Sequence, residues 1–474
     1  MAESNVMVLG TWASPFVLRV KIALRLKSVN YEYHEENLPE SKSDLLLKSN
    51  PVYKKVPVLI HGHNPICESL IIVEYIDEVW TTSASSILPS DAYERAQSRF
   101  WAAYVEDKFS TALRRVLFRA TEEDKRAAMA EVSEGIVLLE EAFVKLSKGK
   151  AFFGGENIGL VDIVFGSLLA WIEVIEKLSE MKLISEAKTP RLVQWADCFS
   201  AHEAVKDVSP AVDKLVEAGT SQQNIYIKTA QICGCERKGD MAESNVKVLG
   251  TWASPFVMRV KIALHLKSVR YEDVEEDLLA PKSELLLKSN PVYKKIPVFF
   301  HAHNPICESL IILQYIDEVW TTSASSILPS DPYERSQSRF WAAYVDDKFF
   351  PALRRLLIGA TEEDKKAALA EVVEGTVVLE GAFGELSKGK AFFGGDNIGF
   401  VDIALGSLLG WIEVIGKQCE TKLVSEAKTP RLVQWAECFS AHEAVKDVLP
   451  DVDKLADFGL KLRAKIFKAL APTN

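Results

Sequence analysis

The chain has 474 residues, of which 48% are hydrophobic and 26% are charged, a composition that excludes a disordered or collagen-like protein. A length about three times that of a typical domain predicts more than one domain. The net charge of −10 gives no electrostatic support for a nucleic-acid or anionic-membrane partner. Seven cysteines without a framework spacing fit a reducing compartment.

No membrane-spanning or secretory segment is predicted. The longest apolar run covers residues 163–172, about half the length that a transmembrane helix needs. The amino-terminal sequence MAESNVMVLG lacks the basic and long apolar regions of a signal peptide. We therefore expect a cytoplasmic (cytosolic) protein without a membrane partner.

The chain is a duplication. The sequence MAESNVMVLGTWASPF at Met1 returns as MAESNVKVLGTWASPF at Met241, and the match continues without a gap to Gly219 and Gly459. A period of about 240 residues lets each copy bury its own core, so we predict two complete globular units joined by a polar linker over 220–240. Because Met241-Ala-Glu reproduces Met1-Ala-Glu, a genuine fusion and two joined reading frames both remain open.

The first part of each copy mixes strands and helices. In copy one we predict a strand over 6–9, a helix over 15–26, a strand over 31–35, a hairpin over 56–67 and a helix over 70–79. Ser14-Pro15 opens the first helix, because serine is a good N-cap and proline is tolerated at the first helical position. These elements form a βαβ-ββα unit of about 80 residues.

The second part, after Tyr93, has helical periodicity throughout. We predict long amphipathic helices over 95–119 and 122–146, a buried helix opened by Gly159-Leu-Val-Asp162, and helices over 186–202 and 203–217. Asp162 stands where the acid of a capping box would be. Each copy therefore ends in an all-helical unit of about 130 residues.

Signals for a metal centre are weak. His61 with His63, and His301 with His303, form H-x-H pairs that we interpret as solvated turn histidines. Cys233-Gly-Cys235 in the linker is interpreted as an incidental pair of thiols. We predict no metal site.

Three short motifs remain, and both copies contain them. They are Trp12-Ala-Ser14-Pro-Phe16, Lys54-Lys-Val-Pro57 and Glu68-Ser69, repeated as Trp252-Ala-Ser254-Pro-Phe256, Lys294-Lys-Ile-Pro297 and Glu308-Ser309. Each has a purely structural alternative: a helix cap, a strand-edge proline, and a first-turn acid. Their order and spacing, together with FWAAYV at Phe100, FFGG at Phe152 and the helix start at Gly159, resemble a glutathione transferase of the plant tau class.

The resemblance implies an α+β fold with two repeats, each a thioredoxin-like N-terminal domain followed by an all-α C-terminal domain. The implied thioredoxin-like domains cover residues 1–82 and 241–322. The implied helical domains cover residues 90–219 and 330–470. The segment 220–240 is the linker between the copies.

The resemblance also implies a glutathione site in each copy. The serine after the first strand, Ser14 or Ser254, hydrogen-bonds the glutathione thiolate. The residue before a cis-proline pairs with the cysteinyl backbone of glutathione. A Glu-Ser pair binds the γ-glutamyl end, the glutamate at its ammonium and the serine at its carboxylate. Two lysines face the glycyl carboxylate. The corresponding residues are Val56, Pro57, Glu68, Ser69, Lys42 and Lys55 in copy one and Ile296, Pro297, Glu308, Ser309, Lys282 and Lys295 in copy two.

A second, apolar substrate site is expected beside the serine. Its candidates are Trp12, Phe16, Arg114 and Trp171 in copy one and Trp252, Phe256, Arg354 and Trp411 in copy two, although ordinary core and surface positions are an equal alternative. The copies differ at Ser110-Thr111 against Phe350-Pro351 and at Ala218 against Phe458. Copy two also continues as LKLRAKIFKAL, an amphipathic helix. We therefore expect a more enclosed pocket and a different electrophile preference in copy two.

The expected function is conjugation of glutathione to hydrophobic electrophiles for detoxification, with glutathione peroxidase as a possible side activity. Glutathione is the co-substrate, and no other cofactor is expected. The alternatives are a carrier of hydrophobic ligands such as tetrapyrroles, flavonoids or fatty-acid derivatives, and a scaffold in which the copies pair within the chain or form a homo-oligomer. Retention of Ser14 and Ser254 favours the enzyme, because a carrier needs no activated thiol.

Overall fold

The computed structural model describes residues 5–38, 41–81, 86–118, 121–222, 246–321, 326–359 and 361–470. The chain forms two compact units, Met1–Gln231 and Ile232–Asn474, one for each copy of the repeat. Cys233-Gly-Cys235 and the rest of the expected linker beyond Gln222 lie outside the described residues.

Each unit begins with a four-stranded mixed sheet. In copy one the strands are β1 (Val6–Gly10), β2 (Glu32–Glu35), β3 (Val58–His61) and β4 (Asn64–Cys67), in the order β2-β1-β3-β4. β1 runs parallel to β2 and antiparallel to β3, and β3 pairs antiparallel with β4. Copy two repeats this arrangement with β5 (Val246–Gly250), β6 (Glu272–Glu275), β7 (Val298–His301) and β8 (Asn304–Cys307). The expected thioredoxin-like fold is confirmed in both copies.

Three helices complete each thioredoxin-like domain. They are α1 (Pro15–Leu26), α2 (Asp44–Ser49) and α3 (Ser69–Val79) in copy one and α12 (Pro255–Leu266), α13 (Glu284–Ser289) and α14 (Ser309–Val319) in copy two. The sequence analysis missed α2 and α13, because six residues are too few to show a helical period. The usable signal was Ser43, whose hydroxyl accepts a hydrogen bond of 3.0 Å from the Leu46 amide as the N-cap of α2.

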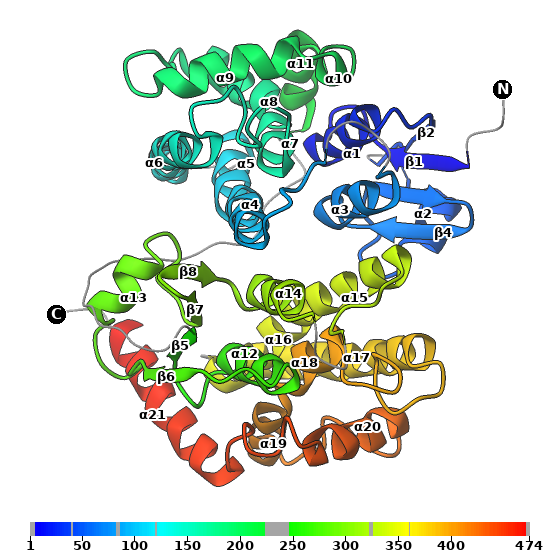
Figure 1. The fold of residues 1–474 in the computed structure, drawn as a ribbon, viewed down its shortest axis with the longest axis vertical. Coiled ribbons are helices and arrows are strands. Elements are labelled where there is room, and N and C mark those ends of the chain that lie inside the picture. Colours follow the sequence, from blue (N-terminus) through cyan, green and yellow to red (C-terminus); the bar gives the residue numbers. More distant parts are fainter. Residues whose placement is uncertain are drawn as a thin grey trace. The chain divides into compact units, whose positions relative to one another are not determined.

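The remainder of each unit is helical. Copy one contains α4 (Ala92–Tyr104), η1 (Val105–Phe109), α5 (Ser110–Phe118), α6 (Glu122–Ser147), α7 (Leu160–Gly166), α8 (Leu169–Ser179), α9 (Pro190–Ala201), α10 (Glu203–Lys206) and α11 (Val212–Gln222). Copy two contains α15 (Pro332–Tyr344), η2 (Val345–Phe349), α16 (Phe350–Ile358), α17 (Glu362–Leu386), α18 (Phe400–Gly406), α19 (Leu409–Gln418), α20 (Pro430–Ala441) and α21 (Val452–Leu470). In copy one these helices form a group beside the sheet domain, with α1 between them and the strands (Figure 1).

Two helix predictions were wrong in the same way. The segment 95–119 is not one α-helix, because a π-helical turn, η1, separates α4 from α5. The apolar run 163–172 likewise divides into α7 and α8 around Ser167 and Leu168. η1 is a wider, π-helical turn, whereas the second break is a tight turn in which the Leu168 amide donates to the Phe165 carbonyl at 3.0 Å. Apolar periodicity detected neither break. The first residues of the expected linker, up to Gln222, continue α11.

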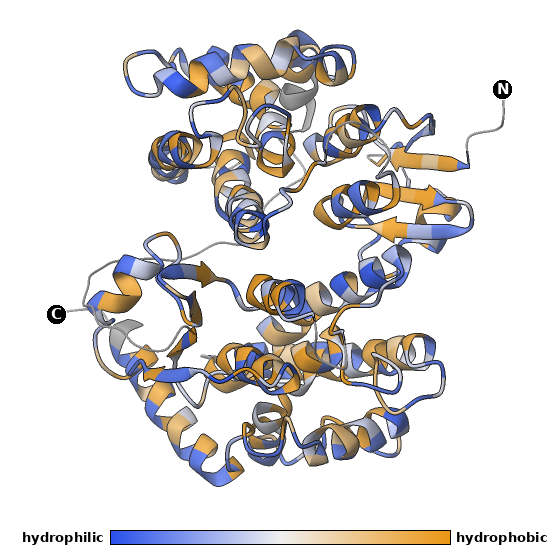
Figure 2. Ribbon diagram, viewed as in Figure 1, coloured by the Kyte–Doolittle hydropathy of each residue, from blue (hydrophilic) through white to orange (hydrophobic). Residues whose placement is uncertain are grey.

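The core of each helical domain is built around a buried aspartate. Asp162 accepts hydrogen bonds from the Phe153, Gly154 and Gly159 amides and from the indole nitrogen of Trp195, at 2.8–2.9 Å. The expected capping role of Asp162 is therefore confirmed, and Asp402 has the same role in copy two. Apolar residues are concentrated in the central strands β1, β3, β5 and β7, whereas the edge strands β2 and β6 are polar, and the helices combine apolar and polar residues (Figure 2).

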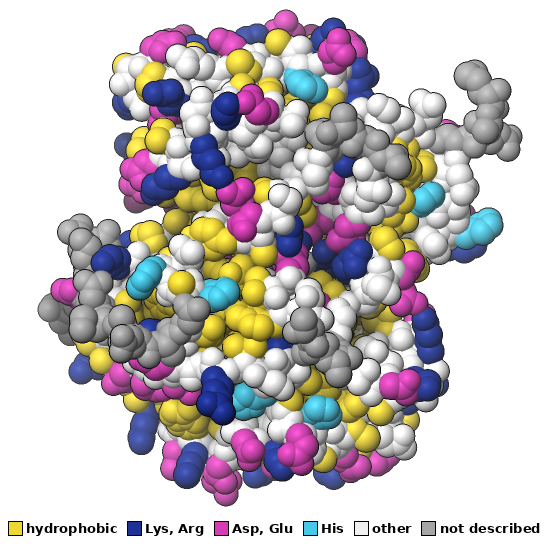
Figure 3. All heavy atoms as spheres, in the orientation of Figure 1, with side chains coloured by type: hydrophobic (Ala, Val, Ile, Leu, Met, Phe, Trp, Pro, Cys, Tyr) yellow, Lys and Arg dark blue, Asp and Glu magenta, His cyan; other side chains and the backbone are white. Residues whose placement is uncertain are grey.

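The surface carries both charge signs. Acidic and basic side chains are interspersed over the visible face of each unit (Figure 3). None of the helices in the described part of the chain combines the length and apolar character that crossing a membrane would require.

Candidate active site

The sheet register brings the three motifs of each copy to one end of the sheet. Leu9 pairs with Val58, and Val58 pairs with Cys67. The neighbouring residues Gly10, Pro57 and Glu68 therefore lie at the same end of the sheet. α1 begins shortly after β1, and α3 begins directly after β4, so both helix N-termini lie at this end. Two helix N-termini at one place favour the binding of anionic groups.

Ser14 is the N-cap of α1. Its backbone is extended, and its hydroxyl accepts a hydrogen bond of 3.4 Å from the Val17 amide. Ser254 has the same geometry at the start of α12, with 3.4 Å to the Val257 amide. Because each hydroxyl accepts this bond, its own proton is available for donation to a ligand.

The peptide bonds Val56-Pro57 and Ile296-Pro297 are both cis. A cis X-Pro bond directs the backbone groups of the preceding residue away from the path of the strand. Pro57 and Pro297 are buried, whereas Val56 and Ile296, just before the central strands β3 and β7, are half-buried. The cis geometry expected from the resemblance is present in both copies.

Glu68 stands between β4 and α3 with a φ of +68°, in the left-handed region that a non-glycine residue seldom adopts. Glu308 repeats this with a φ of +69°. Such a conformation is retained where the surrounding structure requires it, often at a binding site. Ser69 and Ser309, which follow, are the first residues of α3 and α14 and are both 6% exposed.

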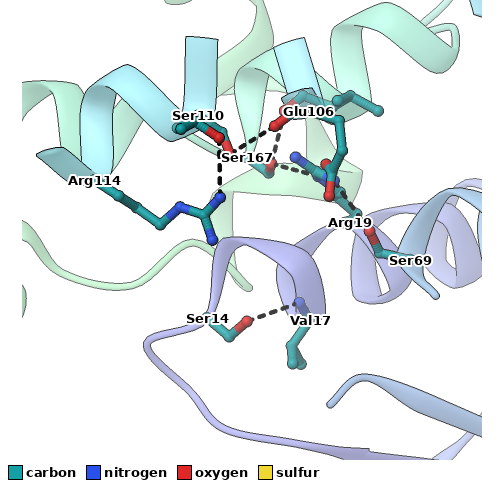
Figure 4. Close-up of polar contacts among 10 residues, drawn as sticks. Ser14, Val17, Arg19, Ser69, Glu106, Ser110, Arg114 and Ser167 are labelled. Atoms are coloured by element: carbon teal, nitrogen blue, oxygen red, sulfur yellow. Dashed lines mark hydrogen bonds and ion pairs between the residues drawn. The ribbon is translucent and has the colours of Figure 1, made fainter. Parts of the chain in front are cut away.

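The sequence analysis missed Arg19, a basic residue within the predicted helix over 15–26. Arg19 is fully buried, and its guanidinium donates hydrogen bonds to Ser69 Oγ at 3.0 Å and to Ser167 Oγ at 3.1 Å and pairs with Glu106 (Figure 4). It thereby joins α1 to the start of α3 and to the helical domain. Only the tertiary structure could show this, since the partners lie 50 to 148 residues away.

Arg259 makes the equivalent network in copy two with one difference. It donates to Ser309 Oγ at 3.1 Å and to Ser407 Oγ at 3.2 Å, and it binds both carboxylate oxygens of Asp346 at 2.9 and 2.6 Å. The η2 turn carries Asp346, as η1 carries Glu106. The π turns therefore have a clear role: each one supplies the acid that neutralises a buried arginine.

The predicted lysines lie at the surface. Lys42 and Lys282 precede α2 and α13, while Lys55 and Lys295 immediately precede the cis peptide, and all four are exposed. Burial, followed by the charges of Lys294 and Lys295, holds the pKa of Lys282 below its ordinary value. The binding of one anionic group by Lys282 and Lys295 stays a prediction.

Trp171 and Trp411, two candidates for the apolar site, are largely buried and hydrogen-bonded. They are 8% and 7% exposed, and their indole nitrogens donate to the carbonyls of Ala13 and Ala253 at 3.1 and 3.0 Å. These carbonyls immediately precede Ser14 and Ser254. Each tryptophan thus attaches the serine turn to the helical domain.

The other apolar candidates lie near the serine in both copies. Phe16 has the Arg19 guanidinium 4.8 Å and the Arg114 guanidinium 6.0 Å from its ring centroid, and Trp12 is 42% exposed. In copy two Trp252 contacts Phe458 and Phe256 contacts Phe350, whereas Arg354 is exposed. The side chain of Ala218 lies outside the described residues.

The candidate turn histidines are not simply solvated. His61 Nδ1 lies 2.9 Å from the Tyr75 hydroxyl and its ring lies beside Trp80, and burial lowers its pKa. His301 repeats this arrangement with Tyr315 and Trp320. Within the described ranges, no cluster of three His, Cys, Asp or Glu residues is arranged to hold a metal ion.

Comparison with known proteins agrees with this geometry. The model of the glutathione S-transferase N-terminal domain matches residues 4–78 and 244–318, and that of the C-terminal domain matches residues 100–203 and 340–443. The chain belongs to the glutathione S-transferase family. It is a tandem member of the tau class and a glutathione transferase enzyme.

Its relatives correspond to one copy each. Glutathione S-transferase U17 of Arabidopsis thaliana is 56% identical over 225 residues, which are 48% of this chain and 99% of the relative. The probable glutathione S-transferase GSTU6 of Oryza sativa subsp. japonica is 54% identical over 45% of this chain and 92% of its own length. The structure of the mango (Mangifera indica L.) tau class glutathione S-transferase is 55% identical, covering 47% of this chain and all of that one, with a TM-score of 0.45.

Proposed function

We propose that each copy of this glutathione transferase binds one glutathione and conjugates it to a hydrophobic electrophile. The observation that supports this most directly is the convergence of three features at one end of each sheet: the serine cap, the cis-proline and the Glu-Ser pair. All three occur in both copies, so both are proposed to be active.

The charges of the site match those of the tripeptide. Glutathione has two carboxylates and one ammonium, so its site needs two cationic or N–H clusters and one anion. In copy one, Lys42 and Lys55 serve the glycyl carboxylate, the α3 N-terminus at Ser69 serves the γ-glutamyl carboxylate, and Glu68 serves the ammonium. Val56 pairs with the cysteinyl backbone beside the cis peptide. Lys282, Lys295, Ser309, Glu308 and Ile296 take these roles in copy two.

Ser14 and Ser254 are proposed to stabilise the thiolate, which is the nucleophile. A free thiol has a pKa of about 8.5 and is mostly protonated at neutral pH. A hydrogen bond to a charged group contributes about 1.5–3 kcal/mol, and a helix N-terminus adds about 0.3–1 kcal/mol. Together they lower the thiol pKa by about 1–3 units, which is enough to populate the thiolate.

The reaction needs no further group from the protein. The thiol proton leaves to solvent, and the thiolate then attacks the electrophilic carbon. The new C–S bond forms while the bond to the leaving group breaks, and the leaving group departs with the electron pair. In the proposed side activity the same thiolate attacks a peroxide oxygen: an S–O bond forms, the O–O bond breaks, and the alkoxide leaves and takes a proton from water. A second glutathione then converts the glutathione sulfenic acid to glutathione disulfide and water.

The test is turnover of 1-chloro-2,4-dinitrobenzene by the full chain and by the Ser14→Ala/Ser254→Ala variant. We expect kcat/KM to fall at least about tenfold in the variant, and its pH profile to move to higher pH, because the thiol loses its donor. Thr121→Ala/Thr361→Ala is the matched control, since these threonines cap α6 and α17 through the same type of hydrogen bond. Unchanged turnover in the serine variant would contradict the assignment.

The carrier alternative makes a different prediction for the same material. A carrier would bind hydrophobic ligands equally well in the serine variant and would show little turnover before the substitution. Calorimetry with glutathione completes the test, because a chain that takes up no glutathione cannot conjugate it. Cytosolic location, and pairing within one chain or between chains, stay predictions.

A further inference from the structure

The two copies differ at positions where the second substrate would meet the thiolate. The residues that begin α5 in copy one are Ser110 and Thr111, and those that begin α16 in copy two are Phe350 and Pro351. These helices lie beside α1 and α12 through Phe16 and Phe256. The copies thus provide an internal comparison of two surroundings for the same serine.

In copy one this region carries an available cation. The Arg114 guanidinium donates a hydrogen bond of 3.2 Å to Thr111 Oγ1 and lies 6.0 Å from the Phe16 ring centroid. Figure 4 shows Arg114 extending from its helix toward the turn that carries Ser14. The guanidinium is exposed and no carboxylate is bonded to it within the described residues, so it retains the capacity to bind an anionic substituent.

In copy two aromatic rings occupy this region. Phe350 contacts Phe256 edge to face at 4.9 Å between ring centroids, and Phe458 of α21 contacts Trp252 in the same manner at 5.6 Å. Arg354, at the position of Arg114, is exposed as well, but Pro351 replaces the threonine that Arg114 bonds in copy one. The side chain that packs against Phe256 from α16 is Phe350. The aromatic wall therefore comes from three segments: the serine turn with α12, α16, and the C-terminal helix.

The serine turn is correspondingly more buried in copy two. Ser254 is 6% exposed and its neighbours Thr251 and Ala253 are 3% and 2% exposed, whereas Ser14 and its neighbours are half-buried. A Cβ on Gly459 of α21 would lie 3.1 Å from the Trp411 ring, so the C-terminal helix packs closely against the tryptophan that bonds the serine turn. This agrees with the more enclosed second copy expected from the sequence.

We propose that the two copies select different classes of electrophile. Copy one takes electrophiles that carry an anionic group, which Arg114 binds beside the thiolate. Copy two takes neutral, planar aromatic electrophiles, which stack among Phe256, Phe350, Trp252 and Phe458. The inference rests on the proposed function, since both classes are attacked by the same glutathione thiolate.

The test compares two activated aryl chlorides that differ in charge, 1-chloro-2,4-dinitrobenzene and 4-chloro-3,5-dinitrobenzoate. In both, the thiolate forms a C–S bond at the chlorine-bearing carbon and chloride leaves. The full chain is used with Ser254→Ala, which leaves copy one, or with Ser14→Ala, which leaves copy two, and turnover by the double variant is subtracted. The ratio of kcat/KM for the neutral probe to that for the carboxylate probe removes their intrinsic difference in reactivity.

We expect this ratio to be at least about tenfold higher for the chain with copy two active, because the two ring contacts favour a neutral aromatic ring there, whereas in copy one the guanidinium of Arg114 lies beside Phe16. Arg114→Leu should lower kcat/KM for the carboxylate probe at least about fivefold and change the neutral probe less than about twofold. Phe458→Ala should lower kcat/KM for the neutral probe in copy two. Leu460→Ala is its matched control, because Leu460 lies on the same helix and is 56% exposed.

The outcomes separate the two proposals. If both probes are conjugated but the ratios agree within about twofold, the division of substrates is wrong and the proposed function stands. If neither probe is conjugated by the unmodified chain, the proposed function fails and this inference fails with it. If neither serine substitution lowers turnover, the ratio of kcat/KM for the two probes is measured instead for Arg114→Leu and for Phe458→Ala, each made in the unmodified chain. An unchanged ratio in both variants would overturn the inference.

Discussion

The indole nitrogen of Trp171 donates a hydrogen bond to the carbonyl oxygen of Ala13, and Trp411 does the same to Ala253. Each bond joins α8 or α19 of a helical domain to the residue before the proposed catalytic serine. The two partners are 158 residues apart in both copies. The helical domain thus holds the serine turn in place as well as supplying apolar surface.

We predict that Trp171→Phe/Trp411→Phe lowers kcat/KM about two- to tenfold, the value of one lost hydrogen bond. The phenylalanine keeps most of the apolar ring but cannot hold the carbonyl, so the serine turn loses its fixed position. The thiolate should be less stabilised, and the pH profile of kcat/KM should move to higher pH. A purely structural role would lower stability and leave the profile in place.

The control for this prediction is Trp101→Phe/Trp341→Phe. Trp101 packs edge to face on Phe100 and Tyr104, and Trp341 does so on Phe340 and Tyr344. These substitutions remove an indole from the helical domains without touching the serine turn. They should leave the pH profile unchanged.

Lys465 connects the C-terminal helix of copy two to its glutathione site. Its ammonium donates to the carbonyls of Leu278 and Ala280 at 2.9 and 3.0 Å, in the loop that leads to Lys282. We predict that Lys465→Ala raises the KM for glutathione about two- to fivefold in a chain with Ser14→Ala, with kcat nearly unchanged, because the loop becomes less ordered. Lys461→Ala, on the same helix and exposed, is the control. A loss in kcat alone would contradict this role.

The buried Asp162 is predicted to be essential for the stability of copy one. Asp162→Ala would leave four donors without this acceptor, three of them buried, so the free energy of unfolding should fall by at least about 3 kcal/mol. Asp213→Ala is the control, since that side chain is 89% exposed and pairs only with Lys177 at the surface. Denaturant unfolding followed by tryptophan fluorescence measures both. A variant as stable as the control would contradict the prediction.

The same aspartate gives a pH dependence with a definite sign. Burial, opposed by its hydrogen bonds, raises the pKa of Asp162 from its ordinary 3.8 to about 6. Between these values the folded chain binds a proton that the unfolded chain lacks, so this group's contribution to stability is present below pH 4 and is lost as pH rises to about 6. The natural chain therefore loses stability across that range, whereas Asp162→Asn has no group to titrate. The free energy of unfolding of the variant minus that of the natural chain should increase as the pH rises from about 4 to about 6. A difference that does not vary with pH would contradict it.

The cysteines beside the site are predicted to be inert. Burial and the neighbouring Glu68 raise the pKa of Cys67 to about 12, and burial likewise raises that of Cys307. At pH 8.5 iodoacetamide should label the exposed Cys198 and Cys438 in the folded chain, and Cys67 and Cys307 only after unfolding. Peptide mass spectrometry gives the extent of labelling at each position. Rapid labelling of Cys67 in the folded chain would show that it can form a thiolate.

The sequence alone did not determine α2, α13 or the breaks at η1 and between α7 and α8, but it determined the duplication, the strands and most helices of each copy and the three motifs of the site. These are local properties: a serine cap before a proline, an X-Pro before a hairpin and an acid at a helix start follow from the chemistry of adjacent residues. The family resemblance added the expectation of cis peptides at Pro57 and Pro297, which the structure contains.

Only the tertiary structure decided which distant residues hydrogen-bond to, or pack against, the residues of those motifs. Arg19 is one of several basic residues in its helix, and its burial against Ser69, Ser167 and Glu106 depends on three segments distant in sequence. The hydrogen bond from Trp171 to Ala13 and the aromatic contacts of Phe256 and Phe458 likewise join segments that are distant in sequence. Helical periodicity reports which face of a segment is apolar, but it contains no information on which distant side chain that face will meet.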